Sequence, residues 1–238
     1  MGKNLIQQKR GKGGPRYRSP GFKYAGKASY RQPSEKITSG KILDIIKCPG
    51  HTAPLIKVEY DDNETSLMIA PEGIKVGDEI KIGPENEIKP GNIASLKDLP
   101  EGTLVYNIEN VPGDGGKVAR STGMFARIVF KSKKKIIVKL PSHKQKEFNP
   151  DCRATIGTIA GSGRLEKPFL KAGKKHYAMK ARNKLWPITS AISMNSLSHP
   201  FGGTKSSHKG KPTQSSRNSP PGRKVGKIAP KRTGRKKR

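Results

Sequence analysis

The chain has 238 residues, and its 49 Lys or Arg against 18 Asp or Glu give a net charge of +31. Hydrophobic residues make up only 32%, and no apolar run approaches the ~18 residues of a membrane-spanning helix, so we expect a soluble, intracellular protein without a membrane partner. The two cysteines, Cys48 and Cys152, lie too far apart in the chain to suggest a disulfide framework, which suits a reducing compartment.

Residues 1–36 are predicted to form a basic N-terminal arm. Gly and Pro interrupt this segment, and it holds 10 basic residues and one acidic residue. Its aromatic residues, Tyr17, Phe22, Tyr24 and Tyr30, alternate with the cations. Such rings either stack on unpaired bases while the cations meet phosphates, or pack onto the next domain.

Residues 37–88 are predicted to form a first small barrel, and residues 89–165 a second. In the first, Ile56, Val58 and Tyr60 alternate with charged residues, which is the period of a half-buried strand. Several short strands separated by turns favour a mainly β fold. Another series of strands follows the boundary at Ile88–Asn92, over 103–108, 124–130, 135–140 and 154–160.

Residues 166–186 are predicted to be a basic, partly helical extension interrupted at Gly173, and residues 187–238 an extended tail. The 72 residues that follow Glu166 contain 20 Lys or Arg and no Asp or Glu. A one-signed stretch of this length repels itself unless a polyanion neutralises it. We therefore expect nucleic acid as the partner, with Lys and Arg meeting phosphates along the tail.

Three local motifs invite other chemistry. Cys48 and His51 have the spacing of half a zinc site but lack a second pair nearby, so no metal and no cofactor is expected. His199 lies among serines, but no carboxylate lies within 30 residues of it, which argues against catalysis. The glycine-rich loop 112–117 lacks the spacing of a nucleotide P-loop, so its glycines are expected to allow positive φ or close backbone approach.

An ordered set of short motifs covers nearly the whole chain. These are APEG at 70–73, IKPGN at 88–92, GDGGKVAR at 113–120, DCRATIG at 151–157, EKPFLKAG at 166–173, MN at 194–195, HPFGG at 199–203 and PPGRKVG at 220–226. Together they closely resemble the large-subunit ribosomal protein L-two family, in its archaeal and eukaryotic branch.

The resemblance implies an OB-fold barrel followed by an SH3-like barrel, with extensions that run through ribosomal RNA near the peptidyl-transferase centre. It also implies a role in subunit association, and it points to Asn195, His199, Gly202 and Gly203 as the closest approach to that centre. The chain departs from the family pattern at Ser190 and Ala191, where Arg and Gly are usual, and at Ser198 and Thr204, where an acid and a third glycine are usual.

We therefore expect a non-enzymatic structural protein of the large ribosomal subunit. Its expected partners are large-subunit rRNA, neighbouring ribosomal proteins and, through an intersubunit contact, the small subunit; it is not expected to be a homo-oligomer. The alternatives are a chromatin-like, nucleic-acid-compacting protein and an enzyme that uses His199. The expected RNA-contacting residues are Lys9, Arg10, Arg16, Arg18, Lys117, Arg120, Arg153, Lys171, Lys180, Arg182, Asn195, His199, Gly202, Gly203, Arg217, Arg223, Lys224, Lys231, Arg232 and Arg235.

Overall fold

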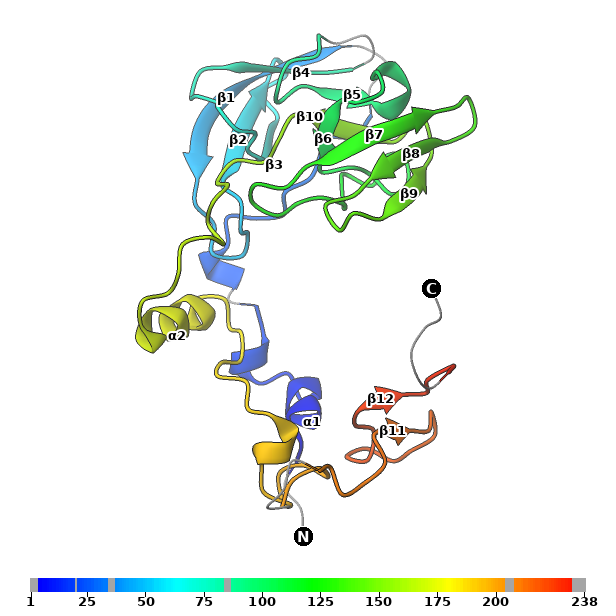
Figure 1. The fold of residues 1–238 in the computed structure, drawn as a ribbon. Helices are drawn as coiled ribbons and strands as arrows, with labels where there is room; N and C mark the ends of the chain where they lie inside the picture. Colours follow the sequence, from blue (N-terminus) through cyan, green and yellow to red (C-terminus); the bar gives the residue numbers. More distant parts are fainter. Residues whose placement is uncertain (1–3, 20, 34–36, 84–86, 204–207, 233–238) are drawn as a thin grey trace. The chain divides into compact units, whose positions relative to one another are not determined.

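The computed structural model describes residues 4–19, 21–33, 37–83, 87–203 and 208–232. The chain divides into two compact units. The barrel unit is Gly21–Pro168 and contains strands β1 to β10 (Figure 1). The other unit combines Met1–Pro20 with Phe169–Arg238. We call it the acid-free unit, because neither of its two segments contains an Asp or a Glu.

The first half of the barrel unit is built from four strands in the order β3-β2-β1-β4. Their bounds are β1 Thr38–Ile46, β2 Leu55–Tyr60, β3 Thr65–Ile69 and β4 Glu79–Ile82. The alternation predicted for β2 is confirmed, since Ile56, Val58 and Tyr60 are all buried in the core. In β1 the pairing with β2 shifts after Ile42, and this bulge leaves Leu43 partly exposed at 38%.

The second half continues the same 10-stranded sheet in the order β5-β10-β6-β7-β8-β9. Its strands are β5 Ile93–Ser95, β6 Leu104–Tyr106, β7 Ala126–Lys131, β8 Ile136–Lys139, β9 Gln145–Phe148 and β10 Arg153–Ile156. The sequence did not predict β9, because three of its four residues are polar and exposed at the sheet edge. Short 3₁₀ helices occur at Gly21–Lys23 and Leu96–Asp98.

The two halves are joined rather than merely adjacent in sequence. A parallel pairing of Ile82 in β4 with Ile93 in β5 carries the sheet across the predicted boundary. A buried cluster then combines Leu55 and Ile69 of the first half with Tyr106 of the second, and the Tyr106 hydroxyl donates to the Ile69 carbonyl at 3.1 Å. The mainly β prediction is confirmed, and the architecture is consistent with an OB-fold barrel followed by an SH3-like barrel.

The predicted N-terminal arm is divided between the two units. Residues 21–33 belong to the barrel unit, where Tyr30 is buried and its hydroxyl donates to the Asn107 carbonyl at 2.8 Å. Tyr24 packs against the buried cluster that contains Ala28. For these two rings, packing onto the neighbouring domain is therefore the outcome, and base stacking is not available to Tyr30.

The acid-free unit contains short elements held together by a small core. The elements are α1 Ile6–Gly11, 3₁₀ helices Pro15–Tyr17 and Ala191–Ser193, α2 Ala172–Lys180, and the parallel pair β11 Gln214–Ser215 and β12 Lys227–Ile228. Leu5, Phe201 and Val225 form a buried cluster that ties the N-terminal segment to the tail. The tail is thus not extended throughout, and Gly173 lies within α2 instead of interrupting it. No helix of the described residues is long and apolar enough to cross a membrane.

Candidate nucleic-acid interface

The acid-free unit concentrates the positive charge of the chain. Its two segments carry 25 of the 49 Lys and Arg residues and no Asp or Glu. A folded surface normally interleaves both signs, because like charges held together in a compact unit repel one another. No carboxylate side chain within this unit can neutralise its cations, so the compensating negative charge has to come from a ligand.

Helix α2 presents cations along its whole surface. None of its residues is buried, and Lys171, which precedes it, and Lys180 in its last turn are both exposed. The large apolar side chains in and before the helix are not buried against a core, since Leu170 and Tyr177 are 82% and 70% exposed. The ammonium of Lys175 lies 5.9 Å from the centre of the Trp186 ring. The helix is thus anchored by a cation–π contact and not by hydrophobic burial.

The N-terminal segment adds further cations, and side-chain contacts hold it in place. Lys9, Arg10, Arg16 and Arg18 are all exposed. After helix α2, the amide of Asn183 donates to the backbone carbonyls of Pro15, at 3.0 Å, and of Arg18, at 2.7 Å. Arg182, which precedes Asn183 and is also among the residues expected to contact RNA, is partly buried. These contacts bring together cations that lie about 165 positions apart in the sequence.

The loop from Met194 to Gly203 is closed by its own backbone. The N–H of Gly203 donates to the Met194 carbonyl at 3.0 Å, and the N–H of Ser198 donates to the Asn195 carbonyl at 2.9 Å. A Cβ placed on Gly202 would lie 2.3 Å from the Met194 carbonyl oxygen. The loop geometry therefore requires glycine at position 202, and the side chain of Asn195 is left exposed.

His199 serves the loop as a hydrogen-bond acceptor. Its Nδ1 accepts the backbone N–H of Phe201 at 3.0 Å, and its ring lies 5.1 Å from the Phe201 ring. Partial burial lowers the pKa of the imidazole below its usual value. Both observations favour the neutral ring with the proton on Nε2, which can then donate a hydrogen bond outward.

A pH-dependent loop follows from this arrangement. Because the folded-state pKa of His199 is lowered, its contribution to stability is present above the usual pKa of about 6.5 and is lost as pH falls through the lowered value. We expect ¹⁵N NMR to show the Nε2–H tautomer at pH 7.5, and the Phe201 amide to lose its hydrogen-exchange protection as the pH falls through the lowered pKa of His199, below the usual imidazole value. Protection that is unchanged over this range would contradict the assignment.

Substituting Gly202 should distort the loop. A Gly202→Ala side chain clashes with backbone oxygen atoms that cannot move aside, so we expect the amide protection of residues 195–203 to fall at least about tenfold. Gly173→Ala is the matched control, because a Cβ there meets nothing within 4 Å and alanine favours the helix. The measurement is hydrogen exchange of the full chain, and an unchanged loop in Gly202→Ala would show that the loop closes differently.

The C-terminal part of the tail adds a partly buried arginine, Arg223. The Nη1 atom of Arg223 is buried and has no hydrogen-bond partner among the described residues. This arginine lines a pocket of about 380 Å³ together with His199 and Lys211. Other predicted residues of this region, namely Arg217, Lys224, Lys231 and Arg232, are exposed, and Arg235 lies outside the described residues. An oxyanion in the pocket would supply the partner that Arg223 lacks.

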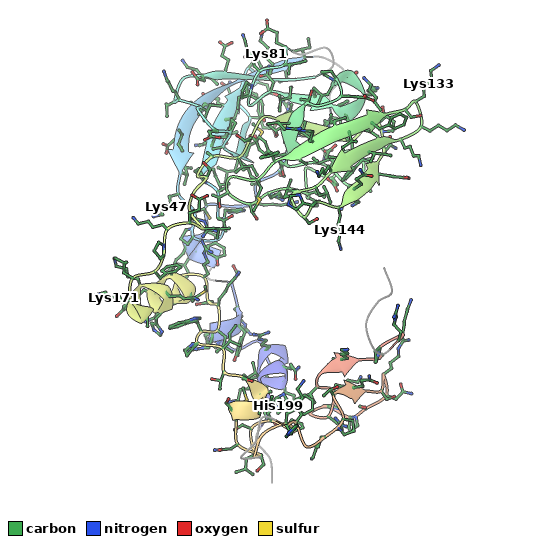
Figure 2. All side chains as sticks on the ribbon, viewed as in Figure 1. Lys47, Lys81, Lys133, Lys144, Lys171 and His199 are labelled. Atoms are coloured by element: carbon green, nitrogen blue, oxygen red, sulfur yellow. The ribbon has the colours of Figure 1, made fainter. Side chains whose placement is uncertain are left out.

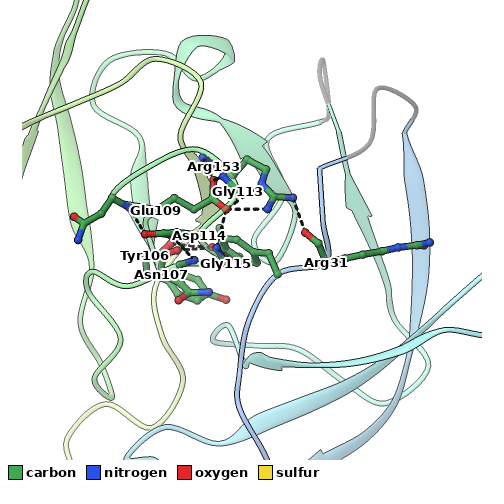
Figure 3. Close-up of polar contacts among 12 residues, drawn as sticks. Arg31, Tyr106, Asn107, Glu109, Gly113, Asp114, Gly115 and Arg153 are labelled. Carbon is green, nitrogen blue, oxygen red and sulfur yellow. Dashed lines mark hydrogen bonds and ion pairs between the residues drawn. The ribbon is translucent and has the colours of Figure 1, made fainter.

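Arg153 departs from the expectation that it contacts RNA. It is 7% exposed, and its guanidinium donates to the carboxylate of Glu109 at 2.8 Å and to the Arg31 carbonyl at 2.9 Å (Figure 3). Glu109 is fully buried and also accepts the backbone N–H of Gly115 at 3.1 Å. Arg153 is therefore occupied inside the barrel unit, and we leave it out of the interface.

The remaining predicted residues lie beside this network. Arg120 is half-buried, donates to the carbonyls of Gly116 and Ala28, and has its pKa lowered by burial. Lys117 is exposed. Of this pair, only Lys117 has its charged group available to a ligand. Arg127 and Lys139 are two exposed cations that were not among the expected RNA-contacting residues. Their alternation with buried residues of β7 and β8 is a signal that the sequence contains.

A β-barrel unit joined to a cation-rich unit without acids defines a nucleic-acid-binding protein. The chain belongs to the ribosomal protein L2 family. Residues 2–82 match its RNA-binding N-terminal domain, and residues 89–224 match its C-terminal domain. The chain is 52% identical to the large ribosomal subunit protein uL2 of Methanococcus maripaludis and 51% identical to those of Methanococcus vannielii and Methanococcus aeolicus. Each match covers 99% of this chain and the full length of the relative.

Proposed function

We propose that this protein is a structural constituent of the large ribosomal subunit that binds large-subunit rRNA and works on the ribosome in the cytoplasm. The observation that carries the proposal is the composition of the acid-free unit, whose two segments contain 25 Lys and Arg residues and no Asp or Glu. Ribosomal RNA supplies phosphates at a density that matches such a surface. The family membership supports the same assignment.

The finer placement concerns the loop Met194–Gly203. We infer that it reaches the RNA near the peptidyl-transferase centre, as the resemblance implies. The closed backbone and the neutral imidazole support this role, because they present Asn195 and the Nε2–H of His199 as uncharged hydrogen-bond donors. Uncharged donors suit the recognition of base edges and 2′-hydroxyls. Contacts with neighbouring ribosomal proteins and with the small subunit belong to the same proposal.

We also propose that the protein is not an enzyme. His199 already accepts a backbone hydrogen bond on Nδ1, and no carboxylate occurs in the acid-free unit to orient the ring. Without an orienting group or an activated nucleophile, the constellation for hydrolysis is incomplete. The protein's part is then to neutralise and hold RNA, while bond-making chemistry lies elsewhere in the particle.

Crosslinking in cells tests the proposal against a chromatin-like function. We expect ultraviolet crosslinks from the acid-free unit to fall in one region of large-subunit rRNA, and the protein to sediment with large subunits. Crosslinks spread over DNA would contradict the proposal and favour nucleic-acid compaction. The barrel unit supports the first outcome, since it mixes 24 cations with 18 acids, a balance that a compacting protein does not need.

A further inference from the structure

A pocket of about 350 Å³ lies on the barrel unit, well away in sequence from the acid-free unit. It is lined by the turn that precedes β7 and by the loop that follows β8. Lys133 marks the hairpin end of this strand pair, and Lys144 marks the opposite end, beside the pocket loop (Figure 2). All of the segment from Gly123 to Lys144 is described, so this part of the surface is fully defined.

Part of the pocket lining is apolar. Met124, Phe125, Leu140 and Pro141 form this part, and Phe125 is 42% exposed. A partly exposed aromatic ring beside aliphatic side chains forms a stacking platform, and every nucleobase has a face that can stack on such a ring. The pocket volume falls in the range of small-ligand sites, which is sufficient for one base.

The pocket lining also contains two cations, Arg127 and Lys139. Arg127 in β7 is paired directly opposite Lys139 in β8, and both side chains are exposed. Like charges directly opposite each other in a sheet are destabilising. Neither of them forms an ion pair with any residue that the structure describes. An anion bound between Arg127 and Lys139 would relieve the repulsion between these two cations.

The opposite end of the strand pair provides a contrast. The depression there is lined by Lys97, Lys131, Lys133 and Lys134, but it also contains Glu101 and Asp151. Lys97 is 2.9 Å from Asp151 and is already neutralised by it. The residues that line the apolar pocket include no Asp or Glu. A high local density of lysine therefore does not by itself identify an anion site, because acids can neutralise it, whereas the charges of Arg127 and Lys139 are not compensated by any acid in the lining of their pocket.

We propose that this pocket binds one unpaired nucleotide of RNA, with its base stacked on Phe125 and its phosphate held between Arg127 and Lys139. The strands fix the geometry, because Ala126, Ile128 and Val138, which alternate with the two cations, are buried in the core. The inference rests on the proposed RNA-binding function but adds a second, independent contact on the barrel unit. An acidic peptide as occupant is the competing outcome of the test.

Methyl NMR of the full chain can test the proposal, since the methionines report on separate places. Met124 lines the pocket, Met68 is buried in the first half of the barrel unit, and Met179 and Met194 lie in the acid-free unit. With ¹³C-methyl-labelled methionine and a uridine trinucleotide as the probe, we expect a saturable shift of the Met124 signal. The Met68 signal should not move.

Two variants and one control make the result decisive. Phe125→Ala should weaken the Met124 response at least about fivefold. Arg127→Ala combined with Lys139→Ala should make the log–log salt slope of trinucleotide binding shallower by about 0.7, because one phosphate contact is lost. Phe130→Ala removes an exposed ring of β7 that lies outside the pocket, and it should change neither the Met124 response nor its salt slope. All variants should retain the signals of the folded barrel unit.

Each outcome bears on one proposal. An unmoved Met124 signal, with Met179 or Met194 still responding, would overturn the pocket assignment and leave the rRNA-binding function intact. A response to an acidic peptide but not to the trinucleotide would replace RNA with protein as the occupant. The proposed function itself fails only if the chain binds no RNA at all, because then no methionine responds and no RNA is retained at low salt.

Discussion

Replacing Glu109 by Ala should destabilise the barrel unit by about 3–5 kcal/mol, since it leaves the buried Arg153 guanidinium without its counter-charge. The carboxylate of Glu109 is fully buried and contacts Arg153 through both the side chain, at 2.8 Å, and the backbone N–H, at 2.9 Å. It also accepts the N–H of Gly115 at 3.1 Å, which holds the glycine-rich loop. One substitution thus opens several contacts at once.

Urea unfolding of the full chain, followed by the circular dichroism of its β-sheet, measures the effect. Glu109→Gln should lie between Glu109→Ala and the unchanged chain, because the amide keeps the shape but removes the charge and adds a donor facing Arg153. Glu147→Ala is the matched control, since the ion pair of Glu147 with Lys135 at 2.7 Å is exposed and surface pairs contribute little. If the control and Glu109→Ala unfold at the same urea concentration, the buried pair does not hold the fold.

Hydrophobic alternation was a reliable guide to the barrel unit and failed where local geometry intervened. The period-2 pattern predicted β2 because every second residue enters one core. In β1, Ile42, Leu43, Ile45 and Ile46 form a mostly apolar run, but the bulge after Ile42 leaves Leu43 and Ile45 partly exposed. A bulge leaves no mark in a run of apolar residues, so the sequence did not contain the information needed to place it.

In the candidate interface, too, features that depend on neighbouring residues could be predicted from the sequence, whereas features that depend on contacts with distant residues could not. The positive φ expected in the glycine-rich loop is confirmed at Gly115 and Gly116, because it depends only on the local chain. The burial of Arg153 depends on Glu109, 44 positions away, and an arginine that is buried by a distant acid looks in sequence like any other basic residue. The packing of Leu5 on Phe201 was likewise not foreseeable from either segment alone.

Binding of large-subunit rRNA should fall steeply with salt, by about 10³–10⁵-fold between 50 and 200 mM, if the acid-free unit makes 6–10 phosphate contacts. Each phosphate that the protein neutralises releases counterions. The slope of log K against log salt concentration therefore reports the number of phosphate contacts, at about −0.9 for each contact on a duplex. A neutral or mixed surface would give a shallow slope. The measurement is filter binding of an rRNA transcript at several salt concentrations.

Two sets of substitutions with equal change in charge locate the contacts. Replacing Lys9, Arg10, Arg217 and Lys224 by Ala removes four exposed cations of the acid-free unit and should reduce the slope by about 3.6. Replacing Lys41, Lys47, Lys75 and Lys81 by Ala removes four exposed lysines of the barrel unit and should leave the slope nearly unchanged. The two chains have the same net charge, so an equal loss in both would mean that overall charge drives binding. A loss confined to the first set would mean that phosphates are bound where no carboxylate competes for the cations.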